Sequence, residues 1–137
     1  MNHLKFSAFN PRSLRNKTTQ VLELFIKEDI DICCLSETWL RKGDTAISNE
    51  FVERGYTLYQ NPREGRGGGT AIAFKSELKL SYQKTPTFTS FEVTEAVCRI
   101  NGKMIRISSV YRSVSKSSLD VFLEEFRSLS AVVDGKA

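Results

Sequence analysis

The feature that most constrains the fold is a strand–helix–strand pattern within the first 36 residues. Residues 4–9 form a predicted short strand with apolar side chains on both faces, which indicates an interior strand. This strand stops at Pro11, because proline has no backbone donor with which to continue a ladder. Residues 16–29 then carry apolar side chains at the period of an amphipathic helix, and residues 30–35 form a second buried strand. The pattern predicts an α/β fold.

Two polar residues directly follow the two predicted strands. A strand–helix–strand unit is nearly always right-handed and parallel, so the carboxyl ends of both strands lie at one edge of the sheet. Asn10 follows the first strand and Glu37 the second, so we expect them to be neighbours. The carboxylate suits a hard cation such as Mg²⁺, and the amide suits a metal-bound water or a phosphate oxygen. The alternatives are a solvated loop glutamate and an asparagine that makes a turn before proline.

The rest of the chain adds strands and one further helix. Residues 65–69 are rich in glycine and lead into a strand, which indicates close backbone approach rather than a nucleotide-binding loop. Asn101-Gly102, between two apolar runs, is a strong hairpin signal. Residues 41–64 are predicted to be irregular except for a strand at 56–59. The other predicted strands are 70–74 and the hairpin strands 91–100 and 103–110. A helix capped at 117–118 follows, and residues 131–133 fit the start of another strand.

Tyr111 and Arg112 end the second strand of the predicted hairpin. A phenol can donate a hydrogen bond to a developing oxyanion, and an arginine fork grips phosphate well. The alternatives are equally simple, since tyrosine is common in strands and arginine is common on surfaces. Each residue alone is therefore weak evidence for a site.

The charge balance suits a polyanionic partner, although the surplus is too small to establish one. Lys and Arg total 20 against 16 Asp and Glu, which gives a net charge of +4 and a pI near 9.1. Arg12, Arg15 and Lys17 follow Asn10 closely, and such residues can contact backbone phosphates without reading a nucleic-acid sequence. A solvated basic loop is the alternative for these three residues.

The chain of 137 residues has the size of one domain, and its cysteine and histidine content excludes several classes of protein. The three cysteines lack paired spacing, which argues against a disulfide scaffold and for a reducing, intracellular location, nuclear or cytoplasmic. Cys33 and Cys34 are adjacent in a strand, so they face opposite sides and fit core positions, as Cys98 does. His3 is the only histidine, which excludes a Ser-His-Asp arrangement. We find no signal-peptide core in residues 1–7 and no membrane-spanning apolar run.

Four ordered segments resemble a known family. They are Asn-Pro-Arg-Ser-Leu-Arg-Asn-Lys at 10–17, Asp-Ile-Cys-Cys-Leu-Ser-Glu-Thr-Trp-Leu at 31–40, Arg-Gly-Gly-Gly-Thr-Ala-Ile at 66–72, and Val-Tyr-Arg at 110–112. The chain resembles the endonuclease/exonuclease/phosphatase superfamily. Within it, the sequences of these segments are most similar to those of the endonuclease domain of LINE-type (non-LTR) retrotransposons. The resemblance covers essentially residues 4–133.

The resemblance implies a four-layer α/β sandwich, with two packed mixed sheets flanked by helices. It also implies hydrolysis of a phosphodiester in DNA with Mg²⁺ or Mn²⁺ as the cofactor. Glu37 corresponds to the metal-binding glutamate of the family, Asn10 to the asparagine of the same site, and Tyr111 to a tyrosine close to the scissile phosphate. Arg12, Arg15, Lys17 and Arg112 are the candidate nucleic-acid contacts.

The sequence departs from the family pattern near its end. The family has a Gly-Asp-Phe-Asn-like segment and a late Ser-Asp-His segment for acid–base chemistry, and Asp134 matches neither. We therefore expect residues 1–137 to form a partial domain, the N-terminal portion of the sandwich, that is catalytically incomplete. The alternative is a non-catalytic remnant that at most binds nucleic acid, and a phosphodiesterase for lipid or inositol-phosphate substrates is a more distant one.

The expected truncation has a consequence for packing. One sheet face would be left exposed as an apolar patch beside unpaired strand edges. We expect such a chain to self-associate or to take up a complementing partner through that face.

Overall fold

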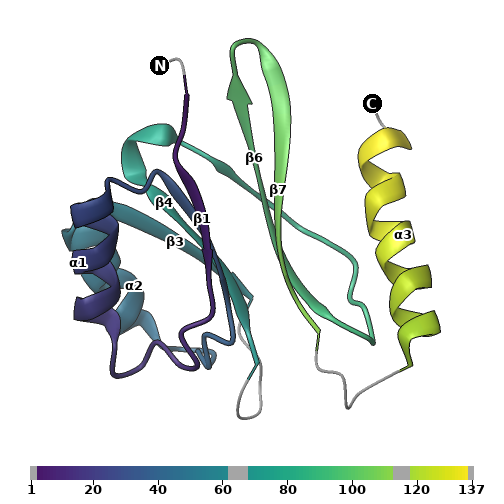
Figure 1. The fold of residues 1–137 in the computed structure, drawn as a ribbon, viewed down its shortest axis with the longest axis horizontal. Coiled ribbons are helices and arrows are strands. Elements are labelled where there is room, and N and C mark those ends of the chain that lie inside the picture. Colours follow the sequence, from purple (N-terminus) through teal and green to yellow (C-terminus); the bar gives the residue numbers. More distant parts are fainter. Residues whose placement is uncertain (1–2, 62–67, 113–117, 136–137) are drawn as a thin grey trace.

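The computed structural model, which describes residues 3–61, 68–112 and 118–135, is a layered α/β sandwich (Figure 1). Two helices cover one face of a four-stranded sheet, a three-stranded sheet packs on the other face, and a third helix covers the outer side of that second sheet. The order helix, sheet, sheet, helix confirms the predicted fold class. No helix in the described ranges is long and apolar enough to cross a membrane.

The first sheet contains the predicted strand–helix–strand unit and has the strand order β1-β2-β4-β3. Strands β1 and β2 are parallel, with Phe6 opposite Ile32, and β4 runs antiparallel to both of its neighbours. The elements of this half are β1 (Phe6–Phe9), α1 (Thr18–Glu28), β2 (Ile32–Ser36), α2 (Thr45–Glu53), β3 (Tyr56–Asn61) and β4 (Thr70–Lys75).

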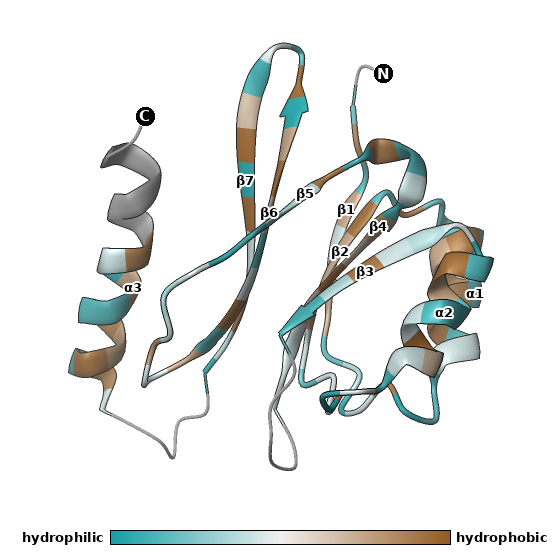
Figure 2. Ribbon diagram, turned by 180° about the vertical axis from the view of Figure 1, so that it is seen from behind, coloured by the Kyte–Doolittle hydropathy of each residue, from teal (hydrophilic) through white to brown (hydrophobic). Residues whose placement is uncertain are grey.

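The second sheet is an antiparallel ribbon in the order β5-β6-β7. Its centre is the predicted hairpin, and the turn has positive φ at Asn101 (51°) and Gly102 (78°), as a tight hairpin turn requires. Hydrophobic and hydrophilic residues alternate along both hairpin strands (Figure 2). The elements are the short 3₁₀ helix η1 (Ser76–Leu78), β5 (Ser81–Gln83), β6 (Glu92–Ile100), β7 (Lys103–Tyr111) and α3 (Leu119–Gly135).

Strand alternation divides the interior into three apolar clusters. On β4, Ala71 and Ala73 face α1 and α2, whereas Ile72 and Phe74 face the second sheet. A third cluster, of Phe91, Val93 and Leu129, lies between the second sheet and α3. The two adjacent cysteines of β2 face opposite sides, as predicted, with Cys33 in the helix-side cluster and Cys34 against the inter-sheet cluster.

The prediction that the first strand is interior was wrong. Within the described part of the chain β1 pairs only with β2 and forms the margin of the sheet. Phe6 is 50% exposed and Phe9 is 39% exposed, although they lie on opposite faces of the strand. The layers on both sides stop short of β1, since β7 packs over β2 and β4. Apolar residues on both faces of a strand therefore do not distinguish an edge strand with exposed side chains from a buried central strand.

Three other expectations were also wrong. The stretch 41–64 contains α2, whose inward side chains Ile47 and Phe51 are too few to reveal a helical period. Residues 131–133 continue α3 instead of starting a strand, because a short run of Ala and Val fits either structure. The sheet face expected to be an exposed apolar patch is covered by the β6–β7 hairpin, which itself supplies the second sheet.

Candidate active site

The ends of β1 and β2 bring Asn10 and Glu37 into direct contact. Asn10 Nδ2 donates a hydrogen bond to Glu37 Oε2 over 2.8 Å, across 27 positions of sequence. Asn10 is exposed and Glu37 half-buried, so both remain accessible from solvent. The predicted proximity is therefore observed, and it results from the parallel pairing of the two strands. The functional roles of these residues stay predictions.

Backbone hydrogen bonds join the loops after these strands into one unit. Ser13 N donates to Glu37 O and Leu14 N donates to Thr38 O, both over 2.8 Å. Arg12 N donates to Asn10 Oδ1 over 3.1 Å, which closes an Asx-type turn and fixes the amide. Because Leu14 and Thr38 are buried, the two loops are anchored from below while Glu37 stays open to solvent.

The same loops concentrate residues in the left-handed backbone region. Positive φ occurs at Arg12 (51°), Ser13 (92°), Glu37 (56°) and Trp39 (58°), which are four of the seven described non-glycine residues with this conformation. Such residues cost of order 1–3 kcal/mol each and persist only where the surroundings over-determine them. Strain of this kind clusters at functional sites, so it supports a site at this edge.

A third loop, at the end of the glycine run, packs under the other two. Thr38 N donates to Gly69 O over 3.3 Å, and Trp39 N donates to Gly68 O over 2.9 Å. A Cβ added at Gly69 would lie 2.7 Å from Thr38 Oγ1, and Gly69 has a φ of +88°. The close approach predicted for the glycine run is confirmed at Gly69, while residues 62–67 lie outside the described ranges.

The second sheet contributes Tyr111 to the same end of the molecule. Ser109 Oγ donates to Leu35 O over 2.9 Å, which joins β7 to β2 just before both strands end. Tyr111 follows Ser109 by two residues, as Glu37 follows Leu35, and β7 ends on the same side as β1 and β2 (Figure 1). Tyr111 is half-buried, and strand alternation places its side chain on the same face of β7 as Ser109, toward the first sheet.

A second carboxylate lies beside this edge, and the sequence analysis missed it. Glu92 is paired with Tyr111 across the hairpin, and Gly69 N donates to Glu92 Oε1 over 2.6 Å. Its position in the sequence carries no signal, because only the register of β6 with β7 places it there. Glu92 therefore links the glycine loop of the first sheet to the strand that carries Tyr111.

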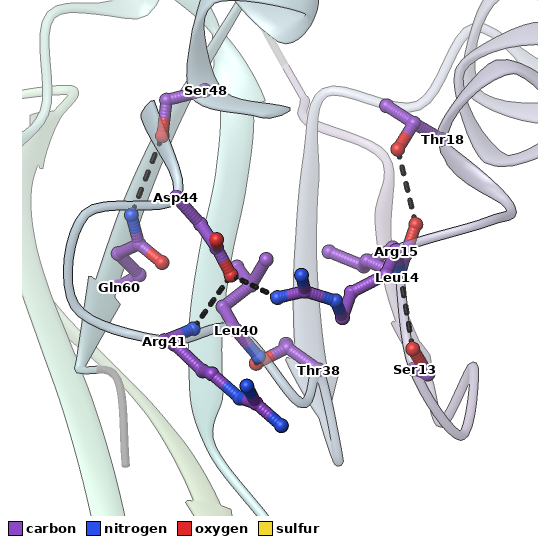
Figure 3. Close-up of polar contacts among 10 residues, drawn as sticks. All are labelled: Ser13, Leu14, Arg15, Thr18, Thr38, Leu40, Arg41, Asp44, Ser48 and Gln60. Carbon is purple, nitrogen blue, oxygen red and sulfur yellow. Dashed lines mark hydrogen bonds and ion pairs between the residues drawn. The ribbon is translucent and has the colours of Figure 1, made fainter. Parts of the chain in front are cut away.

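Arg15 is held by a salt bridge that spans two loops (Figure 3). Arg15 Nη1 lies 2.6 Å from Asp44 Oδ2, and the same oxygen accepts a hydrogen bond from Arg41 N over 2.8 Å. Asp44 precedes α2, so this contact ties the loop after β1 to the start of that helix. Part of the positive charge of Arg15 is thus balanced within the chain.

The other predicted nucleic-acid contacts differ in their surroundings. Lys17 Nζ donates to the backbone carbonyls of Pro11 and Arg12, which fastens the loop, and the Arg12 side chain is exposed. Arg112 points to the other side of the second sheet, where its guanidinium lies 5.1 Å from the ring centroid of Phe122 on α3. Of these residues, Arg12 lies closest in the chain to the Asn10–Glu37 pair.

Burial disfavours the charged, reactive form of the three cysteines. Burial raises the pKa of Cys33 to about 11 and also raises the pKa of Cys34 and of Cys98. All three thiols therefore stay neutral at physiological pH, as expected of core residues. Within the ranges that the structure describes, no three His, Cys, Asp or Glu side chains group together as a metal site.

Comparison with known proteins gives the family. Residues 2–124 match the model of the Endonuclease/Exonuclease/phosphatase family, whereas no curated protein matches the chain. Similar solved structures include an AP endonuclease from Archaeoglobus fulgidus, with a TM-score of 0.57 and 22% identity, and AP endonuclease LMAP from Leishmania major, with 0.60 and 19%. D. rerio TDP2 complexed with single-strand DNA product has a TM-score of 0.66 and 12% identity.

These likenesses cover most of this chain but only part of each relative. The likeness to the A. fulgidus enzyme covers 76% of this chain and 40% of that protein. For LMAP the two shares are 85% and 42%, and for TDP2 they are 98% and 56%. At such identities the structures show the fold alone. The family match spans most of the chain, and so the chain belongs to the endonuclease/exonuclease/phosphatase family.

Proposed function

We propose that this chain carries part of an active site for metal-dependent hydrolysis of phosphodiester bonds in DNA. The observation that carries the proposal is the contact between Asn10 and Glu37, 2.8 Å apart on strained and interlocked loops. An energetically costly geometry around an accessible carboxylate is expected at a functional site rather than in an ordinary loop. Family membership makes phosphodiester chemistry the natural reading of that site.

The residues at this edge fit a hard divalent cation. Mg²⁺ and Mn²⁺ prefer oxygen ligands, and Mg²⁺ usually binds one or two carboxylates and keeps several waters. Glu37 would hold the cation through its carboxylate, and Asn10 would orient that carboxylate through its amide. When bound, the cation supplies Lewis-acid polarisation of a phosphoryl oxygen.

The remaining predicted residues would position the nucleic acid. The Tyr111 phenol would donate a hydrogen bond to the phosphate, and the exposed Arg12 would contact a neighbouring phosphate through charge. DNA is the proposed substrate because two structural relatives bind DNA in their solved structures, TDP2 a single-strand DNA product and the 3' phosphatase NExo from Neisseria a product DNA hairpin. The segments at 10–17 and 31–40 support a LINE-type lineage within the family.

A second candidate function is nucleic-acid binding without catalysis. The described residues hold no group of three potential metal ligands, and the single histidine, His3, precedes β1 at the end of that strand opposite Asn10. Hydrolysis needs a group that activates water as well as a cation. In this candidate Asn10 and Glu37 are inherited parts of a site that does not turn over.

Nicking of supercoiled plasmid separates the two candidates. The full chain is assayed with Mg²⁺ and with EDTA, together with Glu37→Gln, which keeps an acceptor for Asn10 but removes the charge. Glu23→Gln, at an exposed position of α1, is the matched control. Hydrolysis predicts metal-dependent nicking that Glu37→Gln abolishes, and Mg²⁺ binding weakened by about tenfold or more.

The other outcomes are equally clear. Salt-dependent DNA binding without nicking would favour the non-catalytic candidate, because release of counterions makes phosphate contacts sensitive to salt. Nicking that is unchanged in Glu37→Gln would remove Glu37 from the site.

We also propose that the exposed margin at β1 takes up another strand, from a second copy or from a complementing partner. The motivating feature is the outer edge of β1, which pairs with no strand of the described residues and carries the exposed rings of Phe6 and Phe9. Light scattering at increasing concentration tests self-association, which Phe6→Lys should weaken. A monomer at every concentration would rule out the second copy.

A further inference from the structure

Trp39 is a large aromatic residue that the fold leaves exposed beside Glu37. It is the only tryptophan in the chain, and 38% of its surface is accessible to solvent. Its neighbours in sequence, Thr38 and Leu40, are almost completely buried. The loop therefore turns the side chains of Thr38 and Leu40 inward and leaves the indole partly exposed, two residues after Glu37.

The backbone holds Trp39 in this position at an energetic cost. Its φ of 58° lies in the left-handed region, which is a genuine outlier for a bulky side chain. Trp39 N donates to Gly68 O over 2.9 Å, while Thr38 N donates to Gly69 O and Leu40 N to Thr38 Oγ1. Three hydrogen bonds thus fix the loop on both sides of the residue. A backbone fixed in this way limits the positions that the indole can take, which lowers the entropic cost of contact with a ligand.

Ordinary packing explains this arrangement poorly. Leu14 and Leu40, both fully buried, supply the apolar anchors of the two loops, so the loop fold does not depend on an aromatic ring at its surface. A glycine would adopt the same φ without strain. The exposed part of the indole is therefore available for a contact outside the fold, in addition to the packing of its covered part.

We propose that the indole of Trp39 stacks on an unpaired nucleobase of the strand whose phosphate lies at Glu37. This inference rests on the proposed DNA substrate and adds a contact to a base. Every base has a π-face, so an aromatic platform binds single strands with little sequence preference. Tryptophan offers the largest such surface, and its indole N–H can still reach water or a phosphate oxygen.

The sole tryptophan makes the test direct. The full chain is titrated in EDTA, to prevent cleavage, with a fluorescein-labelled single-stranded oligodeoxynucleotide of mixed sequence and with the matching duplex. Anisotropy of the label reports binding, and intrinsic tryptophan fluorescence reports the surroundings of Trp39 alone. We expect the single strand to quench tryptophan fluorescence with the same midpoint as the anisotropy change, and the duplex to quench it less.

Variants sharpen the result. Trp39→Ala should weaken binding of the single strand by about tenfold, whereas Trp39→Phe, which keeps a ring that can stack, should retain most of the affinity. Met104→Ala is the control, because it removes an exposed apolar side chain (61% accessible) beside the β6–β7 turn, at the other end of the second sheet. Circular dichroism of each variant verifies the fold, and the titration of the unaltered chain needs no variant.

Each outcome is decisive. Binding by anisotropy without tryptophan quenching, or with unchanged affinity in a folded Trp39→Ala, would overturn the stacking inference and leave the proposed DNA substrate intact. The absence of any anisotropy change would overturn both.

Discussion

The two outer layers of the sandwich are held in place by different physical forces. Helices α1 and α2 pack on the first sheet through a continuous apolar cluster that includes Phe25, Leu35 and Phe51, all almost inaccessible to solvent. Helix α3 packs on the second sheet through the smaller cluster around Leu129 and leaves Leu123, among other apolar residues, exposed. Apolar burial dominates the first interface, and polar contacts must contribute more at the second.

Those polar contacts are specific. Glu95 is 1% exposed on the face of the second sheet toward α3, and its Oε2 accepts hydrogen bonds from Arg106 and Ser108. Arg106 Nη2 also donates to Leu129 O of α3 over 3.1 Å. At the other end of the interface, the Glu125 carboxylate of α3 accepts hydrogen bonds from Thr89 and Ser90. We therefore expect charge and pH to affect the packing of α3 more than that of α1, whose contact with the sheet is mainly apolar.

The largest expected effect comes from the apolar layer. Phe25 is 1% exposed and contacts the rings of Phe51 and Tyr56 at centroid distances of 6.3 and 5.2 Å. Phe25→Ala should lower the free energy of unfolding by about 3–5 kcal/mol, through lost burial and the cavity left behind. Leu24→Ala, at a 44% exposed position of the same helix, should change it far less. Equal losses in denaturant titrations of the two variants would contradict an apolar origin of this interface.

Breaking the buried ion pair should come next. Glu95→Ala leaves the Arg106 guanidinium buried without its carboxylate, which costs about 3 kcal/mol. The double variant Glu95→Leu with Arg106→Met should recover most of the loss, because it removes both charges at similar volume. Urea denaturation of the unaltered chain, of Glu95→Ala and of the double variant measures how much stability is recovered. A double variant no more stable than Glu95→Ala would show that the loss does not come from the unpaired charge.

An intermediate effect is expected where the two sheets meet at the candidate site. Gly69→Ala forces a Cβ to within 2.7 Å of Thr38 Oγ1 at a φ of +88°, while Gly55→Ala has a similar φ of +92° in open space. We expect a loss of about 1 kcal/mol for Gly55→Ala and about 2 kcal/mol for Gly69→Ala. Thermal unfolding measures the difference, and identical losses would show that the loop yields without cost.

The smallest effect concerns the pH dependence of α3. Hydrogen bonds from the Ser90 hydroxyl and amide lower the pKa of Glu125 from 4.5 to about 2. Because the folded pKa lies below the unfolded value, this stabilisation is complete above about pH 4.5 and is lost as the pH falls through about 2. Amide exchange in α3, compared with α1, should accelerate more at pH 3 than at pH 6 after correction for intrinsic rates. Glu125→Gln should reduce this pH dependence, and an unchanged profile would exclude Glu125 as its source.

The sequence predicted most of the structure wherever a pattern is local. The hairpin at Asn101-Gly102, the α1 crossover and the Ser118 cap, whose Oγ accepts from Val121 N, all follow from short-range chemistry and are confirmed. The contact between Asn10 and Glu37 also followed from topology, because parallel strands joined by a helix end at the same edge. The proposed roles of Asn10 and Glu37 in a metal site depend on the family resemblance as well as on this contact.

Long-range pairing decided the rest. The edge position of β1, the placement of Glu92 beside Gly69, and the contact of Arg112 with Phe122 depend on which layers meet, and no sequence window contains that information. The exposure of Trp39 depends likewise on three loops that pack together from distant parts of the chain. By itself the sequence determined most of the helices and strands, α2 excepted, and the sheet edge where Asn10 and Glu37 meet. Only the tertiary structure decided which side chains lie buried beneath that edge and that Trp39 stays exposed there, because burial depends on neighbours far away in the sequence.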